Sequence, residues 1–400
     1  MSGLNGSRVT RISFGIVLLV CLTTCDGSIT DGDGFGSNRN WAGNYLRIKL
    51  IPEQHPLLGE YSSRNAAIIQ THVSWAQQAE IDFFAIAWRG LESWGHETLE
   101  DYVLEEPAFD DMSWCILYET PTILGDSPDS DSFSLTLADR DTLLNQLLYF
   151  NNHFFSRDNY LHIDGKPVVF LRQSRKITGD ARIALNAMRI AYADSTGGES
   201  VYLVGDEVIW GTVALPDRSR ISAMDAITGI DLSVLSAHDG YPAGTGVLED
   251  VALLWQEYAT VISELPEAIP IVPTVWPGYN DRAWAGITHP IISREVAGGI
   301  ESTGSTYDQM WLIAGAQASD PAVILLNSFN DWQRDTQIEV LADNQDVNGT
   351  TSPTTVTRGI RYFPYANQYI ERTAINKGDL LLGAIYEIWY DNQPPDDMEY

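Results

Sequence analysis

Segments that favour strands alternate with segments that favour helices along most of this chain. Short segments rich in β-branched and aromatic residues predict seven strands, at residues 81–88, 113–119, 166–172, 201–204, 226–230, 269–275 and 322–326. Apolar residues at helical spacing occupy most of the intervals, at residues 68–76, 143–155, 181–193, 247–262 and 306–317. Strands that are separated by helices pair in parallel, so this order predicts an α/β protein built on a parallel sheet.

The length of the chain narrows this prediction. Four hundred residues with 44% hydrophobic content can bury one large core, and this length suits one α/β barrel better than several small domains. We therefore expect residues 39–400 to form a single TIM-type (β/α)8 barrel with a C-terminal extension. Seven recognisable strands leave this barrel one strand short, and the first strand is the uncertain one.

The first 38 residues do not fit the barrel pattern. Arg8 and Arg11 precede an apolar run at residues 12–22, which is too short for a comfortable permanent membrane span. Residues 1–25 therefore predict a signal segment, and residues 26–38 predict a flexible linker. Residues 22–25 resemble a loose bacterial lipobox, which leaves two alternatives. One is a lipoprotein at the cell surface or in the periplasm, with a lipid anchor at Cys25, and the other is a secreted protein.

Cysteine content and charge restrict the partners and the stabilising bonds. If Cys21 and Cys25 are removed or lipidated, only Cys115 remains, so no disulfide framework is possible. The formal net charge is -30, which repels nucleic acid and anionic membrane surfaces. The expected partner is neutral or cationic, and the 12 Trp and 18 Tyr residues suit the apolar faces of sugar rings. Nothing in the sequence implies a protein partner.

The densest polar segment follows the predicted strand at 322–326. Within thirteen residues it carries Asn327, Asn330, Asp331, Trp332, Gln333, Arg334, Asp335, Gln337 and Glu339. A buried parallel strand that ends in such a loop is where α/β barrels and open α/β sheets place their chemistry. Residues 327–339 are therefore the centre of the candidate site.

This segment also resembles a known family. Residues 330–339, Asn-Asp-Trp-Gln-Arg-Asp-Thr-Gln-Ile-Glu, are similar to the Asn-Glu-Trp-His-Glu-Gly-Thr-Gln-Ile-Glu signature of glycoside hydrolase family 99, the endo-α-mannosidase/endo-α-mannanase family. Residues 57–90 and 153–172 also resemble that family. The resemblance implies a retaining hydrolase of α-mannosides with an aromatic first barrel strand before Asn40. Either residues 44–51 supply that strand in divergent form, or the N-terminus is wrong or truncated.

The chain departs from the signature at both catalytic positions that the resemblance implies. The first signature Glu falls on Asp331, which is shorter by roughly 1.5 Å, a displacement that can cost ~10²-fold in rate. The second falls on Arg334, which cannot act as a general acid. Three explanations remain open. The acid is another carboxyl, with Asp335, Glu119 and Glu207 as candidates near strand ends; Arg334 binds a sulfate or uronate on the polymer; or hydrolysis is lost and the cleft only binds.

Candidate substrate-binding residues follow from the same strand ends and from the resemblance. They are Tyr61, Trp88, Asp206, His238, Tyr241, Trp276, Tyr279, Asn330, Trp332, Arg334, Gln337 and Glu339. Trp88, together with Arg89, ends a predicted strand and is a site or rim residue, whereas Trp332 has a core position as its alternative and His238 a structural one. The sequence contains no His-x-x-x-His pair, and the loop at residues 343–349 lacks the closing Glu of an EF-hand. We expect no metal and no other cofactor.

These observations predict an exported protein that resembles glycoside hydrolases and cleaves an extracellular polysaccharide. The resemblance makes the substrate α-mannan-like and the mechanism retaining, with Asp331 as one catalytic carboxylate and a carboxylic general acid that is not identified. The alternative is a catalytically inactive barrel that binds carbohydrate, in which Arg334 replaces the general acid and recognises an anionic sugar.

Overall fold

The structure is a computed structural model that describes residues 56–59, 61–124, 132–135, 137–208, 217–230, 246–281, 292, 306–318, 322–339 and 380–389. The predicted signal segment, the linker and residues 44–51 lie outside these ranges. Within them, no helix combines the length and the apolar character that a membrane crossing needs.

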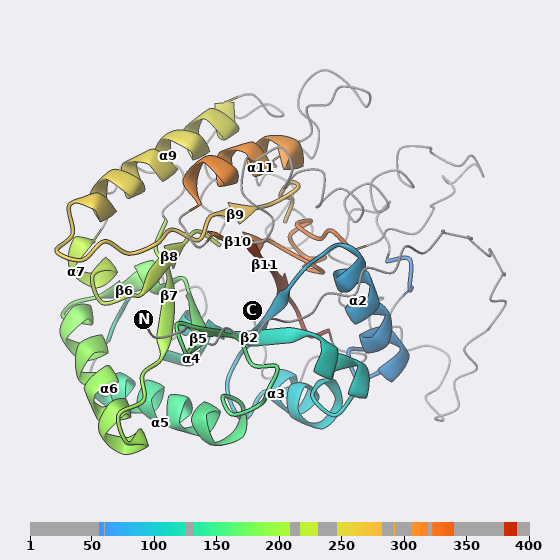
Figure 1. The fold of residues 1–400 in the computed structure, drawn as a ribbon, viewed down its shortest axis with the longest axis horizontal. Helices are drawn as coiled ribbons and strands as arrows, with labels where there is room; N and C mark the ends of the chain where they lie inside the picture. Colours follow the sequence, from blue (N-terminus) through green and yellow to red (C-terminus); the bar gives the residue numbers. More distant parts are fainter. Residues whose placement is uncertain are drawn as a thin grey trace, which may run out of the picture. The chain divides into compact units, whose positions relative to one another are not determined.

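Eight parallel strands form a ring in the order in which they occur in the chain (Figure 1). They are β1 (Phe83–Trp88), β2 (Ser113–Glu119), β5 (Lys166–Arg172), β7 (Tyr202–Asp206), β8 (Ala226–Thr228), β9 (Thr274–Val275), β10 (Ala322–Leu326) and β11 (Leu380–Tyr386). Three two-residue strands, β3 (Phe133–Ser134), β4 (His162–Ile163) and β6 (Ile177–Thr178), lie outside this ring, with β4 antiparallel to β5. The predicted (β/α)8 barrel is confirmed.

The ring closes between β8 and the segment that leads into β9. A parallel bridge joins Ile227 to Ile271, where the amide of Val272 donates to the Ile227 carbonyl at 2.8 Å. The predicted strand at 269–275 is regular only at Thr274–Val275 because its first residues pair with β8 and its last pair with β10.

The eighth strand is at the other end of the chain from where we expected it. Strand β11 pairs with β10 on one side and with β1 on the other, so it completes the ring. The resemblance assigns this ring position to a strand before Asn40. In this chain the position is filled by β11, which lies in the C-terminal region of the chain.

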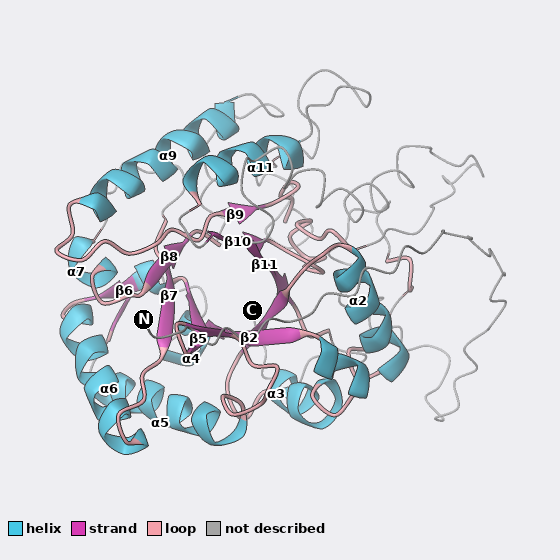
Figure 2. Cartoon of the chain, in the orientation of Figure 1, coloured by secondary structure: helices cyan, strands magenta, loops and turns pink. Residues whose placement is uncertain are grey.

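Helices surround the strands (Figure 2). Within the described residues, the α-helices are α2 (Ala66–Gln78), α3 (Trp94–Thr98), α4 (Thr120–Leu124), α5 (Leu137–His153), α6 (Ala181–Thr196), α7 (Arg218–Ile221), α9 (Gly246–Ser263) and α11 (Thr306–Gln317). Short helices of other types are η1 (Leu99–Val103), η2 (Pro107–Asp111) and η3 (Ser174–Lys176). Helix α2 begins where the Asn65 side chain accepts from the Ala67 amide, and it buries the predicted face of Ile68, Ile69, His72, Val73 and Ala76.

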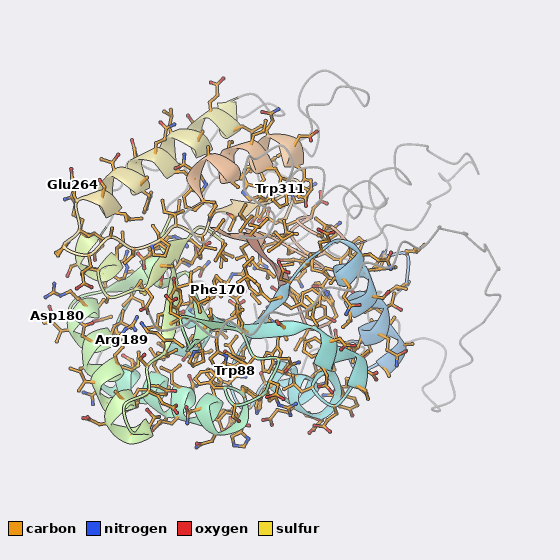
Figure 3. All side chains as sticks on the ribbon, in the orientation of Figure 1. Trp88, Phe170, Asp180, Arg189, Glu264 and Trp311 are labelled. Atoms are coloured by element: carbon orange, nitrogen blue, oxygen red, sulfur yellow. The ribbon has the colours of Figure 1, made fainter. Side chains whose placement is uncertain are left out.

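The barrel interior is packed with side chains rather than open. Phe83 and Phe170 stack with their ring centroids 6.4 Å apart, and Figure 3 shows Phe170 within the ring while Glu264 lies at its outer edge. Gly383 on β11 makes this packing possible, because a Cβ there would lie 2.1 Å from Cζ of Phe83. The Phe83 phenyl ring, which Gly383 faces, therefore leaves no room for a side chain at position 383.

Candidate functional site

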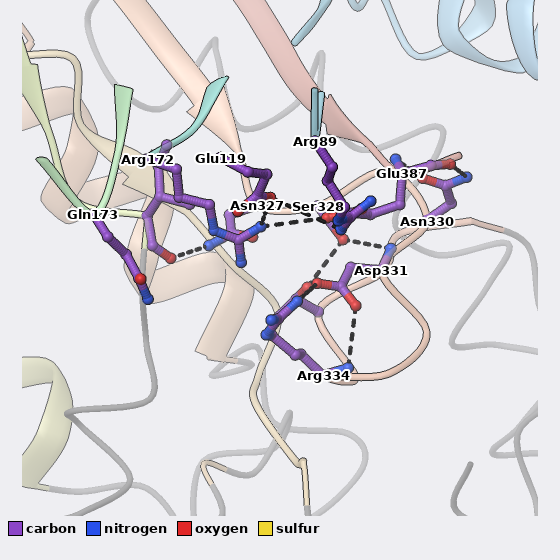
Figure 4. A network of polar contacts seen from close by, with 12 residues as sticks. Arg89, Glu119, Arg172, Gln173, Asn327, Ser328, Asn330, Asp331, Arg334 and Glu387 are labelled. Atoms are coloured by element: carbon purple, nitrogen blue, oxygen red, sulfur yellow. Dashed lines mark hydrogen bonds and ion pairs between the residues drawn. The ribbon is translucent and has the colours of Figure 1, made fainter. Parts of the chain in front are cut away.

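Charged side chains from four strands meet at the carboxyl end of the barrel. Arg89 follows β1, Glu119 ends β2, Arg172 ends β5 and Glu387 follows β11. Figure 4 shows them together with the loop that follows β10, at the end of the barrel where parallel strands place functional groups. Neighbouring strands in the ring therefore carry these charges to one place, although the residues are far apart in the sequence.

Arginines hold the two glutamates together. Nη1 of Arg172 contacts Oε1 of Glu119 at 2.7 Å and Oε1 of Glu387 at 3.4 Å, so the two oxygens cannot be farther apart than the sum of these distances. Nη2 of Arg89 lies 2.8 Å from Oε2 of Glu387 and 3.8 Å from Oε1 of Glu119. All four side chains are largely buried, which strengthens these attractions relative to water.

The charges set the protonation state of Glu387. Burial disfavours its carboxylate, but Arg89, Arg172 and Arg334 outweigh this effect and lower its pKa from 4.5 to about 2. Burial also disfavours the charged form of Arg172, yet Glu119 reverses this and its pKa is raised, against the repulsion of Arg334. Glu387 is consequently a fixed negative charge and a poor proton donor near neutral pH.

Asp331 and Arg334 form a second ion pair in the loop after β10. Nη1 of Arg334 lies 2.8 Å from Oδ2 of Asp331, and the Arg334 amide donates to Oδ1 at 3.3 Å. The Asp331 amide donates to Oγ of Ser328 at 2.7 Å, which fixes the turn. Asp331 is buried, whereas the Arg334 side chain is 34% exposed. The two positions that the signature equates with a catalytic pair therefore neutralise each other here.

Asn330 connects this loop to β11. Its side-chain amide donates to the Glu387 carbonyl at 3.0 Å, and its oxygen accepts from the Glu387 amide at 2.8 Å. The Trp389 indole donates to the Asn330 carbonyl at 2.9 Å. This residue, which we predicted to bind substrate, is fully buried and positions the backbone of Glu387.

Glu339 is the centre of a buried hydrogen-bond cluster beneath the loop. Its Oε2 accepts from the Tyr61 hydroxyl at 2.7 Å and from the Trp332 indole at 2.6 Å. On its other oxygen, Nε2 of His72 lies at 3.2 Å, and Nδ1 of that ring lies 3.0 Å from the Tyr386 hydroxyl. Burial, followed by the Glu339 charge, raises the pKa of Tyr61 well above its usual value, so its hydroxyl keeps its proton. The predicted site residues Tyr61, Trp332 and Glu339 thus brace the loop from inside.

Asp206 and Glu207 are bound to protein groups. Asp206 accepts from the amides of Gln173 at 2.8 Å and Ile230 at 2.7 Å, which fixes the loops after β5 and β8. Glu207 forms a close ion pair with Arg220 at 2.8 Å and accepts from Oγ of Ser174 at 2.7 Å. Of the candidate general acids, Glu207 is therefore committed to a buried pair that involves none of the four strand-end charges.

The other predicted site residues are either packed in the core or bonded to neighbouring side chains. Trp88 is buried, and its indole donates to His96 at 3.2 Å while Phe150 packs edge-on against it. Trp276 is fully buried. Tyr279 donates to Asp281 at 2.8 Å, and Gln337 donates to Asp335 at 3.4 Å. Trp88 and Trp276 are thus packed in the core, whereas Tyr279 lies close enough to Arg334 to affect its pKa.

Two predicted residues, His238 and Tyr241, lie outside the described residues. Within the part that the structure describes, no three His, Cys, Asp or Glu side chains are grouped as metal ligands. Arg172 and Glu387 were not among the site residues that we predicted from the sequence. A signal for Glu387 exists, because the apolar run at 380–386 followed by a Glu repeats the pattern of 113–119.

Solved structures with a similar fold belong to glycoside hydrolases. The GH99 endo-α-mannosidase from Bacteroides thetaiotaomicron matches with a TM-score of 0.58 and 19% identity, over 80% of this chain and 84% of that chain. A second structure of that enzyme, in complex with bis-tris-propane, gives a TM-score of 0.59 and 18% identity, over 84% of this chain and 90% of that chain.

A glycoside hydrolase-like protein matches with a TM-score of 0.57 and 20% identity, over 80% of this chain and 90% of that chain. No protein-family model and no curated protein matches the chain. The structural likenesses show that the chain has a GH99-like barrel fold, and at this level of identity they show the fold alone.

Proposed function

We propose that the protein is a glycoside hydrolase that cleaves a polysaccharide at the carboxyl end of its barrel. The observation that carries this proposal is the convergence of Glu119, Asp331 and Glu387 in one charged network at that end. Glycoside hydrolysis needs two carboxyl groups across the scissile bond, and a barrel of this fold presents its substrate to these strand ends. The GH99-like fold makes an α-mannan-like glycan the first substrate to test.

Asp331 and Glu119 have different roles in this proposal. Asp331 is the carboxylate that acts on the reacting sugar, as the family signature implies for its position. Glu119, which lies within the network, is the proposed proton donor, because Glu387 stays ionised and Glu207 is held by Arg220; Asp335, on the loop after β10, is the other candidate. Glu119 shares Arg172 with Glu387, so neither glutamate has that positive charge to itself. Hydrolysis would then retain the configuration of the anomeric carbon, as the family resemblance implies.

The proposal is tested by measuring reducing ends. Purified protein is expected to release reducing ends from α-mannan or from another polysaccharide. Asp331→Asn is expected to abolish this release. Glu207→Gln serves as a matched carboxylate control, whose activity per folded molecule should match that of the native protein. Release that persists in Asp331→Asn would refute the assigned role of Asp331.

A second candidate function is glycan binding without turnover. The observation that favours it is the ion pair between Asp331 and Arg334, which neutralises one catalytic position and places a group that cannot donate a proton at the other. In that case, a glycan in the gel slows the migration of the protein in affinity electrophoresis, and the protein releases no reducing ends from the same glycan. Retardation together with release of reducing ends would exclude this candidate.

We also infer export, with lipidation at Cys25 as one of two routes. The support is the basic start and apolar run within residues 1–25. Labelled palmitate is incorporated into the native protein but not into Cys25→Ala if the protein is a lipoprotein. Labelling of neither protein, with the native protein in the culture medium, indicates plain secretion.

A further inference from the structure

The unused hydrogen-bond donors of the charged network lie on two arginines. Within the described residues, the Arg334 guanidinium forms its ion pair through Nη1, and Arg172 forms both of its pairs through its own Nη1. Their Nε and Nη2 groups therefore remain available at the carboxyl end of the barrel. Arginine presents such groups as a planar fork that matches sulfate and carboxylate oxygens.

These two guanidinium groups are also close enough to repel each other. The Arg334 charge works against the charged form of Arg172, although Glu119 and Glu387 outweigh it. Figure 4 shows both side chains within the same network. An anion near both arginines would relieve this repulsion and engage donors that the described protein groups leave unused.

The charge of the network decides when an anion can bind. Its ionisable members are the guanidinium groups of Arg89, Arg172 and Arg334 and the carboxyl groups of Glu119, Asp331 and Glu387. With all of them ionised, the network is neutral, and an added anion would leave it negative. One proton on a carboxyl gives the network a single positive charge, which an anion then balances.

We propose that Arg172 and Arg334 bind an anionic substituent of the glycan, a sulfate ester or a carboxylate, and that binding is coupled to the uptake of one proton by the carboxyl groups of the network. The inference rests on the proposed function, because the bound proton is the one that a glycosidic oxygen would receive. The coupling is reciprocal, so the anion promotes protonation and protonation strengthens anion binding.

Isothermal titration calorimetry tests this with a sulfated oligosaccharide, an oligouronate, a neutral manno-oligosaccharide and sodium sulfate. Titrations in buffers with different ionisation enthalpies give the number of protons taken up. We expect the charged ligands to bind with proton uptake and with higher affinity at pH 5 than at pH 8. The sulfated oligosaccharide and the oligouronate separate the two sources of the anion.

Substitutions test the contribution of single residues to anion binding. Arg334→Gln should weaken binding of the sulfated oligosaccharide by about 10- to 100-fold, since it removes a charge-assisted bond. Arg218→Gln is the matched control, because that arginine pairs with Glu264 on another element and should leave binding unchanged. Glu119→Gln keeps the network positive at every pH, so it should bind the anion at least as tightly as the native protein and without proton uptake.

The failure of this inference can be distinguished from that of the proposed function. Equal affinity for charged and neutral oligosaccharides, or anion binding without proton uptake in the native protein, would overturn the inference even if glycans are hydrolysed. Selective binding of charged oligosaccharides with proton uptake would support it even if no glycan is cleaved.

Discussion

Arg334 stands where the family signature has its second Glu, and its Nη1 lies 2.8 Å from Oδ2 of Asp331. Arginine cannot release its proton near neutral pH, so the hydrolysis that we propose needs its proton from another group. Glu119 and Glu387 share the Arg172 guanidinium, and the lowered pKa of Glu387 makes that residue a poor donor. The predictions that follow test this division of roles and the fold that supports it.

Glu387 should stabilise the protein in a way that depends on pH. Because its pKa is lowered from 4.5 to about 2, its stabilising effect is complete above pH 4.5 and disappears as the pH falls towards 2. The effect is of the order of 3 kcal/mol. Urea unfolding of the native protein and Glu387→Gln should therefore show a difference that shrinks across this interval. A difference that does not vary with pH would contradict the assignment.

Glu207 should be important for stability rather than for catalysis. Its buried pair with Arg220 has a closest contact of 2.8 Å, and Glu207→Gln would leave that guanidinium without its partner. Removal of one member of a buried pair costs about 3–5 kcal/mol. Thermal unfolding should show this loss, while kcat per folded molecule stays close to the native value. A fall in kcat of several orders of magnitude would restore Glu207 as a catalytic candidate.

The Tyr61 hydroxyl should hold Glu339 in place. Tyr61→Phe keeps the ring but removes a hydrogen bond of 2.7 Å to a buried carboxylate, which should lower the free energy of unfolding by about 1–3 kcal/mol. Tyr102→Phe is a suitable control, since Tyr102 is 38% exposed. Equal stabilities of the two variants would show that the Glu339 cluster does not support the loop.

Gly383 tests the position of the eighth strand. An alanine Cβ would clash with the Phe83 ring, so Gly383→Ala should destabilise the protein by about 1–3 kcal/mol or more. Gly95→Ala is the control, because the nearest atom to its added Cβ lies 3.8 Å away. The combination with Phe83→Leu should recover part of the loss, and simple additivity of the two effects would place β11 elsewhere.

The sequence predicted the barrel well because its strands are continuous apolar runs buried on all sides, as in 322–326. It failed for β11, because the pattern was judged against an expected order in which the first strand precedes the first helix. Pairing partners are not visible in a single sequence, so nothing marked 380–386 as a neighbour of both β10 and β1.

The site was predictable to the extent that it lies at strand ends. Asp331, Arg334 and Glu119 were predicted as site residues from strand ends and the family signature, and they share the network with Arg172 and Glu387, which were not predicted. The burial of Trp88 and Trp276 was not predictable, because a Trp at a strand end can face either the core or the opening. Which carboxylate pairs with which arginine depends on side-chain geometry across four strands.

Activated substrates test the assignment of Asp331 and Glu119 most directly. An aryl α-mannoside whose leaving group needs no proton is compared with a polysaccharide, by kcat/KM, for the native protein, Glu119→Gln and Asp331→Asn. Glu119→Gln should lose about 10²- to 10⁴-fold on the polysaccharide while it retains most of its activity on the aryl glycoside, and Asp331→Asn should lose activity on both. Equal loss on both substrates in Glu119→Gln, or no loss on either, would contradict its role as proton donor.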